Sequence, residues 1–200
     1  MKTLLLALSF LLFAFATKAD VVLDADGDPL LPGAQYYIYP LPFGPFIGGG
    51  IRPGQASNSI YRTSVLNSFS KEDYGEPLKF QPLQRIGIIK TESNLSIEFV
   101  HTPNGVSSGK WIAVKDLGGT IWTVGIGGAE DHKGYETLNG YFEIKKSIEG
   151  GYQISFASSP NNTVSGDIET DIDYQGKWRL LFIKALPYVV SFVKASYTSS

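Results

Sequence analysis

Leu95-Ser96-Ile97-Glu98-Phe99 alternates apolar and polar residues, and the same alternation returns in Tyr152-Gln153-Ile154-Ser155-Phe156. This pattern is typical of a strand with one buried face. A Gly-Lys-Trp triplet follows each stretch, Gly109-Lys110-Trp111 in the first case and Gly176-Lys177-Trp178 in the second. Unless the triplets recur by coincidence, the repeated order indicates that the chain is built from similar multi-stranded units.

Further stretches rich in Tyr, Phe, Ile, Val and Trp are separated by turns of Gly, Pro, Asn and Ser, whereas helical periodicity is nearly absent. We therefore predict an all-β fold of about twelve strands, at the spacing of a barrel or a sandwich. The predicted strands are Tyr36–Tyr39, Tyr61–Val65, Pro77–Phe80, Ile86–Lys90, Leu95–Val100, Trp111–Val114, Ile121–Val124, Tyr141–Lys145, Tyr152–Phe156, Asp167–Ile172, Trp178–Ile183 and Tyr188–Val193. This count fits three four-stranded units, over residues 20–83, 84–134 and 135–200.

Residues 1–19 have the pattern of a secretory signal peptide. Lys2 gives a positive start, the run from Leu4 to Ala16 is apolar apart from Ser9, and small residues precede a cleavage point after Ala19. The apolar run is too short for a transmembrane helix. Cleavage removes Lys2 and Lys18 and takes the formal net charge from −2 to −4. We expect a single domain over residues 20–200, either secreted or passed to the vacuole along the secretory route.

Two sequons, Asn94-Leu95-Ser96 and Asn161-Asn162-Thr163, are candidate N-glycosylation sites on that route. The chain has no cysteine, which excludes disulfides, thiolate metal sites and cysteine nucleophiles. A domain of this length buries roughly 70% of its unfolded surface, so it does not depend on disulfides for stability.

Several function classes lack support in the sequence. The net charge of −2 provides no electrostatic footprint for nucleic acid or an anionic membrane. The two histidines, His101 and His132, lie outside any zinc-protease motif, and neither a Gly-x-Ser-x-Gly elbow nor a phosphate-binding loop occurs. We expect no enzyme, and no catalytic residue, metal or cofactor.

Asp24-Ala25-Asp26-Gly27-Asp28 begins like a calcium-binding loop. That loop needs glycine at its sixth position and glutamate at its twelfth, where this chain has Pro29 and Gln35. We interpret the segment as an acidic turn.

Four carboxylates alternate along one predicted strand: Asp167, Glu169, Asp171 and Asp173. They could bind a cation or supply a glycosidase pair, but such a pair usually comes from separate elements that flank a cleft. We favour a solvated strand face, with Ile168 and Ile172 in the core.

The segment Phe80–Lys90 contains Pro82, carries little charge and presents Arg85 between a loop and a predicted strand. A protruding arginine can enter the specificity pocket of a trypsin-like protease, where a buried carboxylate accepts two parallel hydrogen bonds from the guanidinium. The alternative is an ordinary solvent-facing arginine at the start of a strand.

A set of motifs runs through the chain after residue 20. It comprises Val22-x-Asp24-x-Asp26-Gly27-Asp28-x-Leu30, then Tyr36-Tyr37-Ile38, Gly75–Phe80, Leu95–Phe99, Trp111, Tyr152–Phe156 followed by Gly166-Asp167-Ile168, and Trp178–Phe192 with Leu186-Pro187. In this combination the sequence resembles the plant Kunitz-type (soybean trypsin inhibitor-like) protease inhibitors over essentially its whole mature length. The resemblance implies a β-trefoil of three four-stranded units.

The resemblance also implies a function. Arg85 falls at the family's primary specificity position, Arg85-Ile86 is the scissile pair, and the reactive-loop flanks are Pro82, Leu83, Gln84 and Gly87. We expect a monomeric inhibitor of trypsin-like serine endopeptidases with a role in plant defence. The alternatives are an inhibitor of papain-like cysteine proteases, or a non-inhibitory β-trefoil that is a storage protein or binds carbohydrate.

Two departures from the family pattern stand out. Many members have four cysteines, but Ser59, Ala157 and Ser165 stand where three of them would fall, which implies a cysteine-free member. Pro32 stands where an asparagine commonly supports the reactive loop through hydrogen bonds, which a proline cannot donate. Gly87 adds further conformational freedom to the loop.

Overall fold

A computed structural model describes residues 19–42, 48–55, 63–115, 120–160, 163–173, 175–183 and 188–195. In these residues thirteen strands join one antiparallel sheet. Their bounds are β1 (Gln35–Pro40), β2 (Ile51–Gly54), β3 (Ser64–Asn67), β4 (Leu78–Pro82), β5 (Leu95–Phe99), β6 (Trp111–Lys115), β7 (Trp122–Ile126), β8 (Thr137–Leu138), β9 (Gly140–Lys146), β10 (Tyr152–Ser158), β11 (Ser165–Ile172), β12 (Trp178–Ile183) and β13 (Val190–Lys194). The described residues also contain one turn of 3-10 helix, Ala129–Asp131. No helix in this part of the chain is long and apolar enough to cross a membrane.

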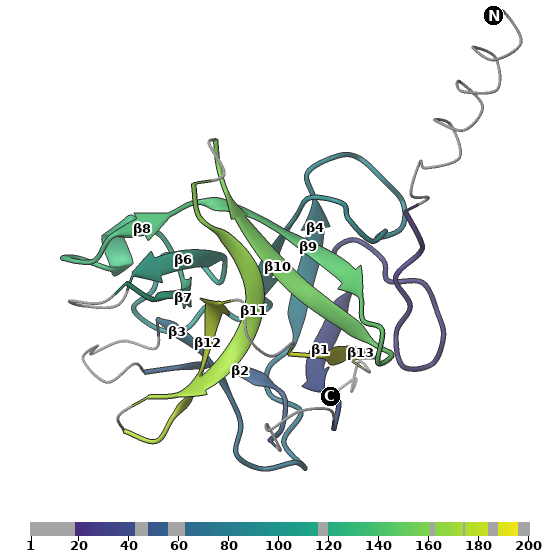
Figure 1. The fold of residues 1–200 in the computed structure, drawn as a ribbon, viewed down its shortest axis with the longest axis horizontal. Coiled ribbons are helices and arrows are strands. Elements are labelled where there is room, and N and C mark those ends of the chain that lie inside the picture. The colour runs from purple at the N-terminus through teal and green to yellow at the C-terminus, as the bar shows by residue number, and fades with distance from the viewer. Residues whose placement is uncertain are drawn as a thin grey trace, which may run out of the picture.

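Six of the strands close into a barrel (Figure 1). β1 pairs with β4 and β13, β4 with β5, β5 with β9, β9 with β10, and β10 with β13, which completes the ring. A closed barrel leaves none of these six strands as an unpaired edge.

Three hairpins extend this barrel: β2–β3, β6–β7 and β11–β12. One strand of each hairpin meets the other two, because β3 pairs with β7, β7 with β12, and β12 with β3. Each unit therefore contributes two barrel strands and one hairpin, which is the β-trefoil arrangement. The predicted all-β fold of three units is confirmed, and the short β8 adds to the second unit by pairing with β6.

The pairing corrects two details of the predicted units. β9 is the barrel strand that closes the second unit, so this unit runs to Lys146 rather than to residue 134. The two Gly-Lys-Trp triplets are not equivalent, since Trp111 opens the first strand of its hairpin and Trp178 the second strand of its own. The alternating stretches β5 and β10 do correspond, because each is the first barrel strand of its unit.

One predicted strand is wrong, and one strand was not predicted. Ile86–Lys90 is an irregular loop, and its one β-type pairing among the described residues is the isolated Val21–Lys90 bridge. Of its isoleucines only Ile89 is fully buried, so this apolar run anchors a loop instead of forming a ladder. β2 (Ile51–Gly54) was missed because Pro53 and Gly54 are unfavourable in strands.

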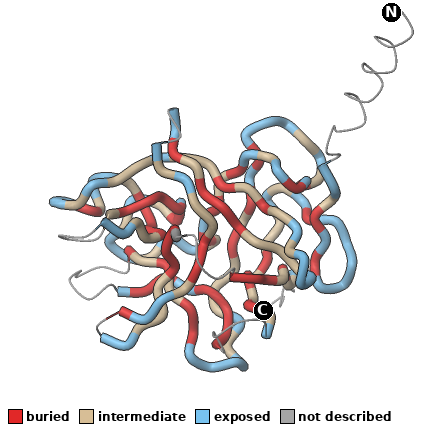
Figure 2. Tube along the Cα trace, in the orientation of Figure 1, coloured by how far each residue is buried: buried red, intermediate tan, exposed pale blue. Residues whose placement is uncertain are grey.

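Buried residues recur along the strands (Figure 2). The core that they form is rich in aromatic rings that contact one another. Phe80 meets Phe192 edge-on with ring centroids 5.2 Å apart, and Phe142 lies 5.7 Å from Trp111 and 5.2 Å from Phe156. Aromatic pairs of this kind add about 0.5–1.5 kcal/mol beyond the area they bury. They stabilise the interior of a chain that has no disulfide.

Candidate reactive loop

The loop between β4 and β5 projects from the barrel next to the amino-terminal segment (Figure 1). Its outer residues are exposed: Leu83 is 63% exposed, and Gln84, Arg85 and Gly87 are also in the exposed class. Ile86 is half-buried. Arg85 therefore stands on an outward-facing part of the loop, between a barrel strand and a buried anchor.

The middle of the loop has no internal support. In the part of the chain that the structure describes, no hydrogen bond or ion pair involves any residue from Gln84 to Ile88. A methyl group added at Gly87 would meet nothing within 4 Å, so packing does not require glycine there. The backbone polar groups of residues 84–88 are left available for an intermolecular partner.

The amino-terminal flank of the loop is held by the sheet. Pro82 is buried at the end of β4, opposite Leu95 of β5. The Leu83 N–H donates to the backbone oxygen of Asn94 at 2.9 Å, which extends the β4–β5 pairing by one step. The strand ladder thus reaches to within two residues of Arg85.

The carboxyl-terminal flank is held by the amino-terminal segment of the protein. The Ile89 N–H donates to the Leu30 oxygen at 2.9 Å, and the Ile89 oxygen accepts from the Val22 N–H at 3.0 Å. One step further, the Thr91 N–H donates to the Asp20 oxygen at 2.8 Å, and the Asp20 N–H donates to Thr91 Oγ1 at 2.9 Å. The sequence-based reasoning missed this support, because only the fold brings residues 20–22 and 89–91 together.

Asp20 also forms an ion pair with Lys146 of β9, with 2.8 Å between the Asp20 carboxylate and Nζ. The hydrogen bond and the charge of Asp20 raise the pKa of Lys146. Both side chains are more than half exposed, so solvent screens the pair and it contributes little to stability.

Pro32 lies half-buried in a turn whose neighbouring residues contact both flanks of the loop. The Leu30 oxygen accepts from Ile89, and the Gly33 N–H donates to the Phe80 oxygen of β4 at 3.0 Å. Gly33 has a φ of 74°, a conformation that glycine adopts without strain. Backbone atoms on either side of Pro32 therefore hold the two ends of the loop, although proline has no N–H to donate.

The acidic segment at residues 24–28 supports the same region. Asp24 Oδ1 accepts the N–H groups of Asp26 and Asp28 at 3.1 and 2.9 Å, and the Ala25 N–H donates to the Phe192 oxygen of β13 at 2.8 Å. The interpretation as an acidic turn is confirmed. The turn directly precedes Leu30, whose backbone oxygen accepts the hydrogen bond from the Ile89 N–H.

The carboxylates of β11 do not form a solvated row. Glu169 and Asp173 are each only 5% exposed, whereas Ile172 is 49% exposed. Ile168 is buried as predicted, but the placement of Ile172 in the core is wrong. Since Ile168 and its neighbour Glu169 are both buried, both faces of the strand are covered at that point. The Asp173 carboxylate accepts the N–H groups of Gln175 and Lys177 and closes the turn to β12.

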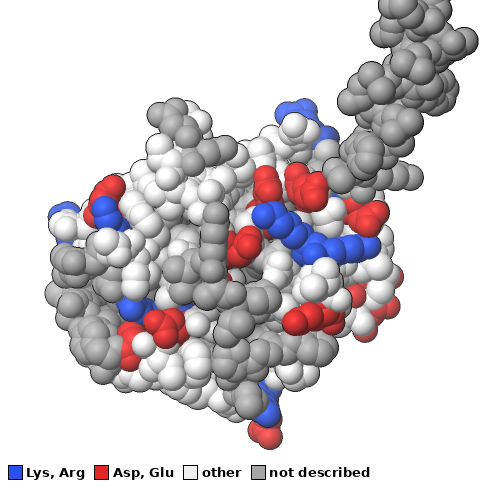
Figure 3. Space-filling view, viewed as in Figure 1, with Lys and Arg blue, Asp and Glu red and all other residues white. Residues whose placement is uncertain are grey.

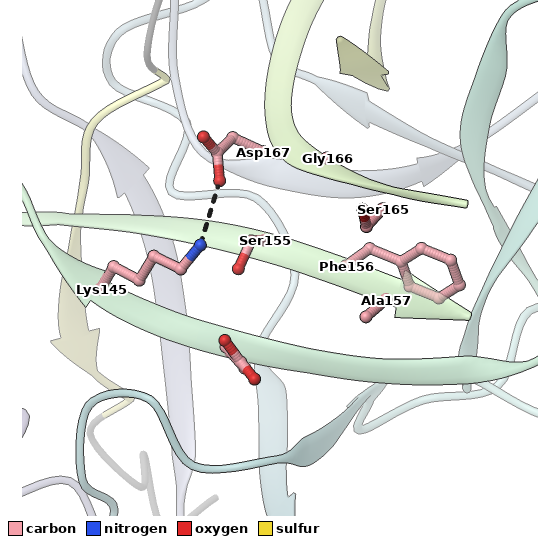
Figure 4. Close-up of a pocket in the computed structure, with 8 residues that line it drawn as sticks. Lys145, Ser155, Phe156, Ala157, Ser165, Gly166 and Asp167 are labelled. Atoms are coloured by element: carbon pink, nitrogen blue, oxygen red, sulfur yellow. Dashed lines mark ion pairs between the residues drawn. The ribbon is translucent and has the colours of Figure 1, made fainter. Parts of the chain in front are cut away.

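The first carboxylate of this set, Asp167, lies in a shallow surface pocket over β9–β11 (Figure 4). Its Oδ1 is 3.5 Å from Lys145 Nζ, and the two side chains lean toward one another across Ser155 of β10. Lys145 therefore provides a partly exposed counter-charge for Asp167. On the face drawn in Figure 3, acidic and basic side chains are likewise interspersed.

The two histidines have different surroundings. His101 is exposed, while His132 is buried with Nε2 3.0 Å from the Ile126 oxygen. Burial lowers the pKa of His132, which favours its neutral form. Among the described residues, no three His, Cys, Asp or Glu side chains lie close enough together to hold a metal ion.

Some of the positions assigned to missing cysteines and to sequons lie in the described part of the chain. Ala157 and Ser165 lie directly opposite one another on β10 and β11. Asn94 is exposed and directly precedes β5. Ser59 and Asn161 lie outside the described residues.

This geometry, an exposed loop carrying Arg85 on a β-trefoil, agrees with the relationship found by sequence comparison. The model of the Kunitz legume family, described as trypsin and protease inhibitors, matches residues 22–194. The chain belongs to this family. The resemblance inferred from the motifs is therefore confirmed, as is the expectation that the protein is not an enzyme.

Kunitz relatives with different targets resemble this chain. The Kunitz-type elastase inhibitor BrEI of Bauhinia rufa is 40% identical over 142 residues, which are 69% of this chain and 96% of that protein. The subtilisin inhibitor CLSI-II of Canavalia lineata is 37% identical over 180 residues, 88% of this chain and 93% of its own.

Solved Kunitz structures have the same fold. A Kunitz-type trypsin inhibitor from Cicer arietinum superimposes with a TM-score of 0.82 at 35% identity, over 88% of this chain and 99% of its own. The soybean trypsin inhibitor in complex with porcine pancreatic trypsin gives a TM-score of 0.75 at 29% identity, over 88% of this chain and all of its own.

Proposed function

We propose that this Kunitz protein inhibits trypsin-like serine endopeptidases by presenting Arg85-Ile86 as a substrate-like bond. The observation that carries the proposal is an exposed Arg85 in a loop whose middle makes no hydrogen bond or ion pair to any described residue, while both flanks are anchored. Relatives named as elastase and subtilisin inhibitors indicate that one scaffold serves several proteases. Arginine at the specificity position favours a pocket with a buried carboxylate.

The anchors provide a mechanism for inhibition rather than digestion. A loop already held in place loses little conformational entropy on binding, so more of the contact energy appears as affinity. If the protease cuts Arg85-Ile86, Leu83 stays bound to Asn94, and Ile89 stays bound to Leu30 and Val22. The new ends then remain close together and religation competes with hydrolysis. An interface of ~1,600 Å² is sufficient for such a complex.

We also propose that the protein acts outside the cytoplasm as a monomer, on a protease met outside the cell or in the vacuole. The support is the signal-peptide pattern of residues 1–19, of which residues 1–18 lie outside the described residues. Cleavage after Ala19 would keep Asp20, whose backbone holds Thr91. This placement agrees with a role in plant defence.

The direct test titrates trypsin with the protein comprising residues 20–200 and follows the Arg85-Ile86 bond by mass spectrometry. We expect trypsin activity to fall linearly to zero at one inhibitor per enzyme, with slow cleavage confined to that bond. Papain, titrated in parallel, is expected to stay active. Trypsin that remains fully active at micromolar protein, or that rapidly digests the loop, would refute the proposal.

Thr91 offers a test of the anchor itself. Thr91→Val keeps the shape of this buried side chain but removes the oxygen that accepts the Asp20 N–H. A lost hydrogen bond costs ~0.5–1.5 kcal/mol, so we expect the bound loop to be hydrolysed roughly 2- to 10-fold faster. The measurement is the rate at which trypsin activity returns from the complex. Thr91→Ser keeps the hydroxyl and should behave like the unmodified protein. If trypsin activity returns from the Thr91→Val complex at the same rate as from the complex of the unmodified protein, Thr91 is not a positioning residue.

A further inference from the structure

One of the sequons lies at the foot of the reactive loop. Asn94 is exposed and directly precedes β5, and its backbone oxygen accepts the hydrogen bond from Leu83. Leu95 is fully buried, while Ser96 is half-buried with its Oγ 3.4 Å from the Gln81 oxygen of β4. The acceptor asparagine therefore faces solvent, while the rest of the motif is part of the sheet.

Asn94 also shares a hollow with the residues on both sides of Arg85. The lining residues are Pro82, Leu83, Gln84 and Ile86 from the loop, and Glu92, Ser93 and Asn94 from the turn that leads into β5. Glu92 sits in this turn with a φ of 57°, and its N–H donates to the Ile144 oxygen of β9 at 2.9 Å. The turn therefore places Asn94 in the same hollow as Gln84 and Ile86, the two residues that flank Arg85 in the chain.

We propose that Asn94 carries an N-linked glycan in the secreted protein and that this glycan limits the access of proteases to Arg85-Ile86. The second part rests on the proposed function. The modification forms a bond between the Asn94 side-chain nitrogen, which loses a proton, and C1 of the first N-acetylglucosamine. The C1–oxygen bond to a lipid-linked pyrophosphate breaks, and the pyrophosphate leaves with the electron pair. The secretory route supplies this lipid-linked oligosaccharide.

Folding is compatible with the modification. The Ser96 hydroxyl is part of the motif and becomes half-buried against β4, so transfer must precede the pairing of β4 with β5. Once the barrel has formed, the exposed Asn94 leaves room for a glycan outside it.

The position of the glycan on Asn94 determines how it affects the association of a protease with the loop. A standard interface takes in ~20–30 residues of each partner, so a protease seated on residues 83–88 also reaches the residues that line the same hollow. A branched, hydrated glycan on Asn94 occupies part of that volume and has to move aside before the loop can enter the active site. The expected consequence is slower association with trypsin.

The test expresses the full chain, with its own amino-terminal segment, in a secreting yeast. Four samples are compared: the unmodified protein, Asn94→Gln, Asn161→Gln, and the unmodified protein trimmed by endoglycosidase H to a single sugar. We expect peptide mass spectrometry to find the glycan on Asn94. Asn94→Gln and the trimmed protein should associate with trypsin at least about 10-fold faster than the untrimmed protein. Asn161→Gln, the matched control that keeps the Asn94 sequon, should stay slow.

An unoccupied Asn94 in the secreted protein, or equal association rates with and without the glycan, would overturn the proposal. If the glycan-free samples also fail to inhibit trypsin, the proposed function fails instead. The effect of the glycan on protease access is then measured by the initial rate at which trypsin cuts Arg85-Ile86. This rate should still be slower in the untrimmed protein.

Discussion

Replacing Arg85 with alanine is expected to weaken trypsin inhibition by about 30- to 1,000-fold. Truncating an anchor residue at the centre of an interface costs ~2–4 kcal/mol, and here it also leaves the carboxylate of the specificity pocket without a partner. The loss should appear in the inhibition constant measured with trypsin. The melting temperature should not change, because Arg85 is exposed and forms no ion pair among the described residues.

Two variants keep this experiment specific. Arg85→Lys retains the positive charge and should remain an inhibitor of trypsin. Arg52→Ala removes another exposed arginine, which pairs with Asp73 at 2.8 Å on the hairpin strand β2, away from the reactive loop (Figure 1). It should inhibit like the unmodified protein. An Arg85→Ala variant that inhibits as tightly as Arg52→Ala would show that another surface binds the protease.

Replacing Phe80 with alanine is expected to lower the free energy of unfolding by about 3–5 kcal/mol, the usual cost of removing a large buried aromatic side chain. Phe80 is fully buried, with its ring centroid 6.2 Å from that of Tyr36 and 5.2 Å from that of Phe192. Its backbone oxygen also accepts the Gly33 N–H beside the reactive loop. Because the chain has no disulfide, packing at such positions carries the stability.

Urea unfolding followed by tryptophan fluorescence measures this loss. Phe69→Ala is the matched control, since Phe69 is 64% exposed and its replacement should change the free energy by no more than about 0.5 kcal/mol. Similar unfolding midpoints for the two variants would contradict the assignment of Phe80 to the core.

Much of this architecture could be anticipated from residue patterns. The alternation in residues 95–99 and 152–156 marked β5 and β10, because a strand with one buried face must place apolar side chains at every second position. The pattern failed at Ile86–Lys90, where three isoleucines suggested a strand. Periodicity cannot distinguish an apolar residue that faces a strand partner from one, such as Ile89, that anchors a loop.

Some features of the candidate reactive loop could likewise be predicted from the sequence, and others could not. Its chemistry is local, since an arginine in a proline-containing, sparsely charged segment and a sequon nine residues further on can be recognised from the residues themselves. The support of the loop is not local. Thr91 is held by Asp20, 71 residues away, through hydrogen bonds that exist only once the barrel has closed.

Side-chain alternation and turn residues, which act over a few positions along the chain, were thus sufficient for an all-β fold of about twelve strands. The motifs were sufficient to recognise the family, and that resemblance implied the β-trefoil and the role of Arg85. The tertiary structure alone established which segments anchor the two flanks of the loop, that Glu169 and Asp173 are buried, and that Asn94 shares a hollow with the loop. These features depend on contacts between segments far apart in the chain, and only the packed barrel selects among the many pairings that the local pattern allows.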